Sequence, residues 1–297
     1  MIIANPIYDV VFKYLLEDTE IASELLSTIL GEEIISLELK PQETTTENTS
    51  GSISILRFDF KAVIKTQAGE QKKVLIELQK AKQVFDVMRF RRYLGDNYRK
   101  EDTVLDESGE SVKIPLPIVT IYFLGFSLDN IKRAVVKISH NYEDVNTKEI
   151  LDVKEDFVEI LTHDSFLIQL RVLPRESRTK LEKVLQVFNP EFGSEDDKHQ
   201  LNFTGDLNEP LVQKMVLRLE RAMASEEVRN KMDVEDDIDR IFARELGKKD
   251  KIIAAKDEEL EAEKQRAETE KQRAETEKQR AEQLFIELEE LKKQLKK

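Results

Sequence analysis

The stretch VLIELQK, Val74–Lys80, decides how the fold is interpreted, because it places a carboxylate in the middle of an apolar strand. Side chains alternate along an extended strand, so Glu77 and Gln79 point to the same side, about 7 Å apart. The question is therefore what faces Glu77 from the neighbouring strand.

The run before it, ISILRFDFKAVIKT, predicts a second strand, joined to the first by the hairpin residues QAGE. A two-residue loop would set Asp59 opposite Leu78, on the other face from Glu77. A three-residue loop with Gly69 in the left-handed region, a bulge, would set Asp59 directly opposite Glu77. We favour the second register, because glycine adopts this conformation without a steric penalty.

Two opposed carboxylates, about 5 Å apart at Cβ, repel each other unless a cation lies between them. Carboxylate oxygens suit Mg²⁺ or Mn²⁺. A basic group follows at once, in the segment 80–100, whose only acids are Asp86 and Asp96. Its members are Lys80, Lys82, Arg89, Arg91, Arg92, Arg99 and Lys100. A metal-activated water beside cations that accept phosphates is the chemistry of phosphodiester hydrolysis.

The elements predicted along the front of the chain are a helix, three strands, a helix and two further strands, which indicates a mixed α/β layer fold. The first helix lies within NPIYDVVFKYLLEDTEIASELLSTILGEE and ends at Gly31. A second helix spans residues 83–99, with Val87, Phe90, Leu94 and Tyr98 on one face. Charged residues 101–113 predict a loop before the apolar strand in PIVTIYFLGF.

This order, with Asp59 on one strand and Glu77-Leu78-Gln79 on the next, resembles the PD-(D/E)XK nuclease superfamily. More narrowly, the chain resembles the recombination-promoting nuclease and transposase branch, in which a glutamine replaces the superfamily's lysine, as Gln79 does here. YDVVFKYLL, RFRRY and LPIVTIYFLG also match that branch. The resemblance covers about residues 5–140 and, weakly, LTHDS near Thr162. It implies a restriction-endonuclease-like α-β-β-β-α-β core.

The resemblance also implies a site and an activity. Asp59 and Glu77 would hold Mg²⁺ or Mn²⁺ together with the Leu78 carbonyl, and Gln79 would orient the attacking water. Arg89, Arg92 and Tyr93 would contact DNA, with the two arginines positioning the scissile phosphate. The superfamily often adds a glutamate of the first helix, and the sequence leaves Glu20 and Glu24 as candidates. Lys61 would pair with a carboxylate or contact phosphate.

Composition limits the other classes of function. The sequence contains neither a nucleotide-binding glycine loop nor a nucleophile elbow, and it has no cysteine, which excludes disulfides and thiolate metal sites. The three histidines lack the spacing of metal ligands. The N-terminus lacks the features of a signal peptide, and the longest apolar run is too short for a membrane span. We expect a bacterial cytoplasmic protein without membrane contact.

The net charge of -13 argues against unspecific coating of nucleic acid. Residues 206–297 hold 21 of the 47 basic and 25 of the 60 acidic residues, so the preceding part is the more acidic. We expect three parts: a nuclease-like domain (1–150), a helical extension (151–247) and a long charged helix (248–297).

The last part contains the seven-residue repeat AEKQRAE-TEKQRAE-TEKQRAE, whose alanines form a thin seam. Only Leu284, Leu288, Leu291 and Leu295 have coiled-coil spacing, so a solvated helix is favoured and self-association through its end stays open. The alternative to a nuclease is a non-catalytic scaffold that assembles through this helix.

Overall fold

The computed structural model describes residues 1–40, 60–80, 84–105 and 108–294, which form two compact units, Met1–Glu235 and Asp236–Lys297. The helices are α1 (Asp9–Leu16), α2 (Thr19–Leu30), α3 (Val84–Tyr98), α4 (Asp156–Leu161), α5 (Lys180–Leu185), α6 (Pro210–Ala224) and α7 (Glu226–Gln294). The strands are β1 (Ile2–Ala4), β2 (Ile34–Lys40), β3 (Phe60–Thr66), β4 (Gln71–Gln79), β5 (Asp102–Leu105), β6 (Ser111–Ile114), β7 (Ile118–Leu124), β8 (Val135–Ile138), β9 (Tyr142–Glu143), β10 (Ile150–Leu151), β11 (His163–Gln169) and β12 (Gln200–Asn202).

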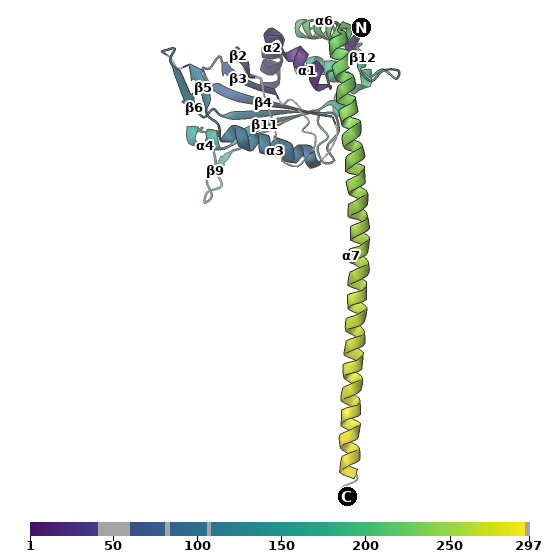
Figure 1. Ribbon diagram of the computed structural model, residues 1–297. Helices are drawn as coiled ribbons and strands as arrows, with labels where there is room; N and C mark the ends of the chain where they lie inside the picture. The colour runs from purple at the N-terminus through teal and green to yellow at the C-terminus, as the bar shows by residue number, and fades with distance from the viewer. Residues whose placement is uncertain (41–59, 81–83, 106–107, 295–297) are drawn as a thin grey trace. The chain divides into compact units, whose positions relative to one another are not determined.

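A six-stranded mixed sheet, in the order β2-β3-β4-β7-β11-β8, organises the first unit (Figure 1). Strands β4, β7 and β11 run parallel in its centre, whereas β2, β3 and β8 pair antiparallel. Helix α3 connects β4 to β7, as parallel neighbours require a crossover. The expectation of an α/β fold with a mixed sheet is confirmed at this level.

The two faces of the sheet are covered by different helices (Figure 1). Val74 and Ile76 of β4, with the corresponding residues of β3, β7 and β11, join the main core together with α1, α2 and α6. Leu75 of β4 and Ile118 of β7 point to the other face, where they meet Phe90 and Tyr93 of α3. We call this second side the α3 face. The alternation predicted for β4 is therefore confirmed, and it assigns Glu77 to the α3 face.

The N-terminal segment contains two helices where one was predicted. The side chain of Asp18 accepts hydrogen bonds from the backbone nitrogens of Glu20 and Ile21, both at 3.2 Å, and so caps α2. An aspartate in this position stabilises a new helix start better than a continued turn. The predicted end of the helix is confirmed, since Gly31 terminates α2 at φ 72°.

The segment predicted as a charged loop, 101–113, instead contributes the hairpin strands β5 and β6. Val104 and Val112 pair within it. These strands have four residues each, and one of the two buried positions of β5 is the charged Asp102, so their sequence resembles that of a loop.

The domain boundary expected near residue 150 falls inside the first unit. Strand β11 occupies the interior of the sheet between β7 and β8, and β12 pairs with β1. Helix α6 buries six apolar residues in the main core. Residues 151–235 are therefore an integral part of the α/β unit rather than a helical extension, whereas residues 236–247 belong to the second unit.

The long charged helix is present, and it begins earlier than the predicted residue 248. Helix α7 starts at Glu226, and its first turns bury Val228 and Met232 in the main core. Among the described residues, none of the helices has the length and apolar character needed to cross a bilayer.

Candidate active site around Glu77

The β3–β4 hairpin has the register that the favoured three-residue loop predicts. Phe60 pairs with Ile76 and Lys61 with Leu75. The backbone nitrogen of Thr66 donates to the carbonyl of Glu70 at 2.9 Å, and Gly69 has φ 89°. The first residue before this ladder is Asp59, which lies outside the described residues, as do all residues 41–59. Its proximity to Glu77 stays a prediction.

Glu77 and Gln79 are both buried, at 2% and 7% exposure, near the C-terminal end of β4. Strand β7 lies beside them, in parallel register, with Tyr122 level with Glu77. The backbone nitrogen of Gly125 donates to the Gln79 carbonyl at 2.8 Å. A side chain at position 125 would press its Cβ to 2.7 Å from the Lys80 carbonyl oxygen, so only glycine permits this close approach.

Tyr122 is a neighbour of Glu77 that the sequence did not single out. The pKa of the Tyr122 phenol is raised to about 12, mainly by burial and also by the negative charge of Glu77, while a hydrogen bond with Thr120 acts in the opposite direction. The phenol is therefore a protonated hydrogen-bond donor throughout the physiological range. Its signal in the sequence is the alternation of Ile118, Thr120 and Tyr122, which interrupts an otherwise apolar strand with polar groups on one face.

Helix α3 covers this face with its apolar side, which includes Phe90, Leu94 and Tyr98. Phe90 meets the ring of Tyr122 edge-on, with centroids 4.7 Å apart. This contact places the early turns of α3 near the Glu77 end of β4. Arg92 is exposed on this helix, as a phosphate contact requires, whereas the side chain of Arg89 is not among those described. Tyr93 is 7% exposed and packs with Phe90, which leaves little of its ring for DNA, and that contact stays a prediction.

Two lysines close to the site are engaged by acids. Lys80 forms an ion pair with Glu235, and its ammonium lies 3.7 Å from the centre of the Tyr8 ring. Lys61 pairs with Asp102 at 2.7 Å, which confirms the carboxylate alternative for this residue. The basic group that follows β4 in sequence is thus divided: Lys80 is half-buried and paired with an acid, and Arg92 is exposed.

Asp102 also binds a second lysine, Lys73, at 2.5 Å. The Lys73 side chain is 1% exposed, and its ammonium donates to the carbonyl of Asn97 in the last turn of α3 at 3.1 Å. Burial lowers the pKa of Lys73, and the ion pair with Asp102 opposes this shift. The hydrogen bond from Lys73 to Asn97 anchors the C-terminal end of α3 to β4, on the face of the sheet to which Glu77 also points.

The two glutamates proposed for the metal site lie elsewhere. Glu20 and Glu24 each pair with Lys214 of α6 at 2.6 Å. Helices α2 and α6 cover the face of the sheet opposite to α3. The structure therefore does not bring either glutamate together with Glu77.

Of the ligands predicted for a metal at Glu77, the structure describes some and not others. Within the described ranges, no group of three or more histidine, aspartate or glutamate side chains could hold a metal ion. The predicted set Asp59, Glu77 and Leu78 contains only two such side chains and includes one residue outside those ranges. A buried carboxylate on the α3 face nonetheless offers the oxygen ligand that Mg²⁺ and Mn²⁺ prefer.

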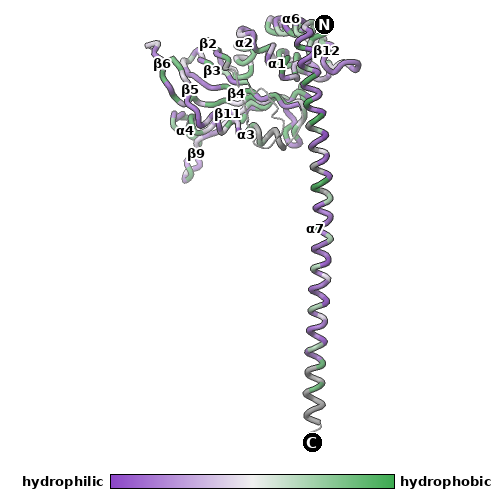
Figure 2. Tube along the Cα trace, in the orientation of Figure 1, coloured by the Kyte–Doolittle hydropathy of each residue, from purple (hydrophilic) through white to green (hydrophobic). Residues whose placement is uncertain are grey.

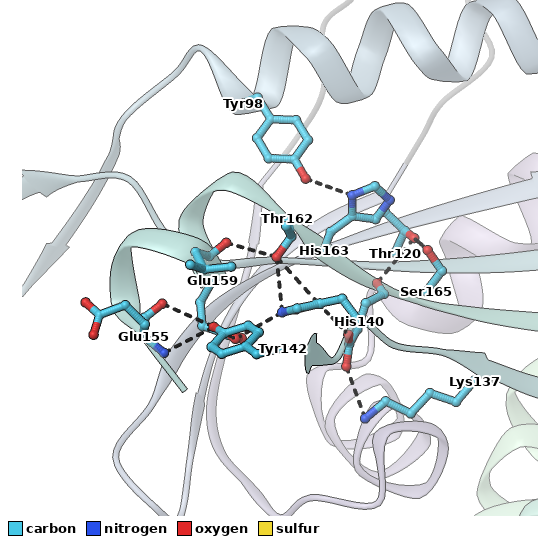
Figure 3. A network of polar contacts seen from close by, with 12 residues as sticks. Tyr98, Thr120, Lys137, His140, Tyr142, Glu155, Glu159, Thr162, His163 and Ser165 are labelled. Carbon is cyan, nitrogen blue, oxygen red and sulfur yellow. Dashed lines mark hydrogen bonds and ion pairs between the residues drawn. The ribbon is translucent and has the colours of Figure 1, made fainter. Parts of the chain in front are cut away.

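A second polar network lies at the opposite ends of β7 and β11 (Figure 3). Tyr98 of α3 and Nδ1 of His163 are 2.7 Å apart, and Thr120 donates to Ser165 at 2.8 Å. Burial raises the pKa of Tyr98 and lowers that of His163, so both groups are neutral near pH 7. The first pair ties α3 to β11 and the second ties β7 to β11. The spacing of His163 and Ser165 on one strand face was visible in LTHDS.

His140 forms a neighbouring cluster beside α4 (Figure 3). Its ring lies 3.1 Å from Glu159, 3.4 Å from Asp164 and 3.2 Å from the hydroxyl of Thr162. His140, Glu159 and Asp164 border a cleft of about 830 Å³ at the N-terminal ends of the parallel strands. Its charges largely pair with one another, as Lys137 does with Asp164 at 3.1 Å. The cleft therefore gives little indication of a ligand.

No protein-family model, curated protein or solved structure matches this chain. The residues themselves must therefore carry any assignment of function.

Proposed function

We propose that this chain is a Mg²⁺- or Mn²⁺-dependent DNA endonuclease of the recombination-promoting nuclease type, with Asp59 and Glu77 as its metal ligands. The observation that carries the proposal is the register of the β3–β4 hairpin, set by Gly69 at positive φ. If the same register continued by one residue, Asp59 would lie opposite Glu77. The mixed sheet, with α3 between β4 and β7, is compatible with the core that this nuclease family uses.

The residues around Glu77 would have different roles in hydrolysis. A bound divalent cation would supply an activated water and neutralise charge at the phosphate. The Leu78 carbonyl would complete the ligand set, and the Gln79 amide would orient the attacking water by hydrogen bonds. An amide cannot take up a proton at neutral pH, so Gln79 would position rather than act as a general base. Arg89 and Arg92 would hold the scissile phosphate.

The decisive experiment is plasmid nicking with Mg²⁺ or Mn²⁺ at low salt, comparing wild type with Asp59→Ala and Glu77→Ala. We expect both substitutions to abolish nicking. Glu24→Gln is the matched control, because this carboxylate pairs with Lys214 on the other side of the sheet and should be dispensable. Loss of activity in Glu24→Gln, or wild type that leaves the plasmid intact, would refute the assigned site and favour the scaffold alternative.

Metal binding can also be followed without activity. A cation that binds only the folded chain raises its melting temperature. We expect Mn²⁺ to stabilise wild type, and Glu77→Gln to lose this response while its apo form becomes more stable, because one of two repelling carboxylates is gone. Equal shifts in both proteins would indicate a metal site elsewhere.

A further inference from the structure

The repeat segment of α7 is a helix whose whole surface is exposed. Every side chain from residue 255 to residue 284 is solvent-exposed, and Figure 2 shows hydrophilic colour along most of this stretch. In proteins, most of the stability of a helix comes from packing an apolar face against other elements. The segment must therefore gain its stability either from its own side chains or from a second helix.

Its own side chains provide a regular set of attractive pairs. Glu263, Glu270 and Glu277 each precede an arginine by three residues, and the first two of these arginines precede the next glutamate by four. Such neighbours lie on one side of a helix and support it when their charges are opposite. At the start of the repeat, Glu261 and Lys264 lie 3.7 Å apart. The threonines are satisfied locally as well, since Thr269 and Thr276 each donate to the carbonyl one turn back at 2.8 Å.

Pairing with a second copy is opposed by the same charges. If Ala267 and its repeats occupy position a of a coiled coil, Glu270 takes position d, Lys271 position e and Arg266 position g. A parallel pair would then oppose glutamates in its seam and bring Arg266 next to Lys271 of the other helix. An antiparallel pair would oppose lysines with lysines and arginines with arginines at its flanks.

The other assignment fails for the same reason. With the alanines at position d, lysines take position a, and glutamates occupy both flanking positions e and g. Lysines then face each other in the seam of a parallel pair, and glutamates meet glutamates at the flanks in either orientation. Like charges at these positions destabilise the pairing. The repeat is consequently attractive within one helix and repulsive between two.

We propose that the repeat segment of α7 is a monomeric, rigid spacer that stands as a single helix held by its own ion pairs. The described part of the second unit, residues 236–294, rises about 90 Å as a continuous helix, at roughly 1.5 Å per residue. A flexible chain of this length would hold its ends only about 45 Å apart on average. The rod thus fixes a long distance between its own two ends. This role is independent of the proposed nuclease activity.

The chain contains no cysteine, so spin labels can be placed at will in the full-length protein. Ala255→Cys with Gln283→Cys puts two labels at positions that point outward in both heptad assignments. We expect a narrow distance distribution centred at about 42 Å in dipolar electron resonance, which is the helical rise between the two positions. A broad distribution centred at about 30 Å, the value for a flexible chain, would overturn the rigid spacer.

The single variant Gln272→Cys tests the monomer. We expect no defined distance between labels of different molecules, and a mass that does not change with concentration. A defined intermolecular distance would show a coiled coil and overturn the proposal.

Charge variants of the doubly labelled chain separate the two sources of stability. Changing Glu263, Glu270 and Glu277 to Gln removes attraction within the helix. The same change also removes the repulsion between two helices that are paired with the alanines at position a. For helices paired with the alanines at position d, the matching variant changes Lys264, Lys271 and Lys278 to Gln. We expect both sets, and likewise high salt, to broaden the distribution and shorten the mean distance. A sharper distribution accompanied by dimerisation would mean that a second helix supports the segment and would overturn the proposal.

Discussion

Gly69 is the single residue on which the geometry of the candidate site depends. Its φ of 89° sets the bulge, and the bulge sets which side chain of β3 stands opposite each side chain of β4. A shift by one residue would send every side chain of one strand to the other face. This register could be predicted from the sequence because glycine stood at the third loop position, where the bulge requires it.

Gly69→Ala tests this dependence. Nothing lies within 4 Å of an added Cβ, so any cost arises from the backbone conformation rather than from a clash. We expect a loss of about 1–2 kcal/mol in the free energy of unfolding, measured with urea. The matched control is Gly95→Ala in the interior of α3, where the added Cβ also meets nothing. Here alanine should stabilise by roughly 0.5–1 kcal/mol. Equal effects at the two sites would refute the assigned strain.

Tyr122 shows what single-strand patterns leave out. The sequence placed it on a strand, but its position beside Glu77 arises from the parallel pairing of β4 with β7. Helix α3 and the β5–β6 hairpin separate these two strands along the chain. Strand order in a parallel sheet is fixed by packing of distant elements, so local alternation does not reveal which two strands meet.

The raised pKa of Tyr122 makes a prediction for alkaline pH. In the unfolded chain a tyrosine ionises near pH 10, whereas burial raises the pKa of Tyr122 to about 12 in the folded protein. Between these two pH values Tyr122 is deprotonated in the unfolded chain but stays protonated in the folded protein. The free energy of unfolding therefore falls as pH rises. We expect Tyr122→Phe to lose this component, on the order of 2–3 kcal/mol, and to unfold in urea with a weaker pH dependence from pH 10 to 12. Identical pH profiles of variant and wild type would contradict the assigned environment.

At the scale of elements, the helices and strands with strong periodicity were predictable, and their association was not. Strands β4 and β7 and helix α3 have clear apolar faces, and they were expected where they occur. Strand β11 has the sequence HDSFLIQ, which mixes polar and apolar residues and so does not predict a position in the interior of the sheet. Its place between β7 and β8 follows from long-range pairing, which local patterns do not encode.

Truncation distinguishes the observed unit from the predicted boundary. A chain ending at residue 150 loses β11 from the sheet and α6 with its buried side chains, such as Met215 and Leu219. We expect it to lack a cooperative melting transition in circular dichroism, because the main core would be opened on one side. A chain ending at residue 247 retains the whole first unit and should melt as wild type does. Cooperative melting of the shorter chain would restore the boundary at 150.

At the scale of the whole molecule, the net charge has an uneven source. Residues 248–297 contain 14 basic and 14 acidic residues, so they are neutral. The remaining 33 basic and 46 acidic residues, and hence the whole net charge of -13, belong to residues 1–247. An acidic protein repels the DNA backbone over a distance. Contact with DNA would therefore depend on a local basic surface, for which the exposed Arg92 on α3 is one candidate.

This distribution predicts how DNA binding responds to salt. Each phosphate contact releases counterions, so the logarithm of the affinity falls with the logarithm of the salt concentration in proportion to the number of contacts. We expect Arg92→Ala to weaken binding to all DNA sequences alike and to reduce this slope by about one. Deleting residues 248–297 should leave both affinity and slope unchanged, because the segment balances its charges along its own length. Fluorescence anisotropy with one labelled duplex across a range of salt concentrations measures both quantities. A smaller slope after the deletion would place the phosphate contacts on the tail, and an unchanged slope in Arg92→Ala would remove α3 from the DNA-binding surface.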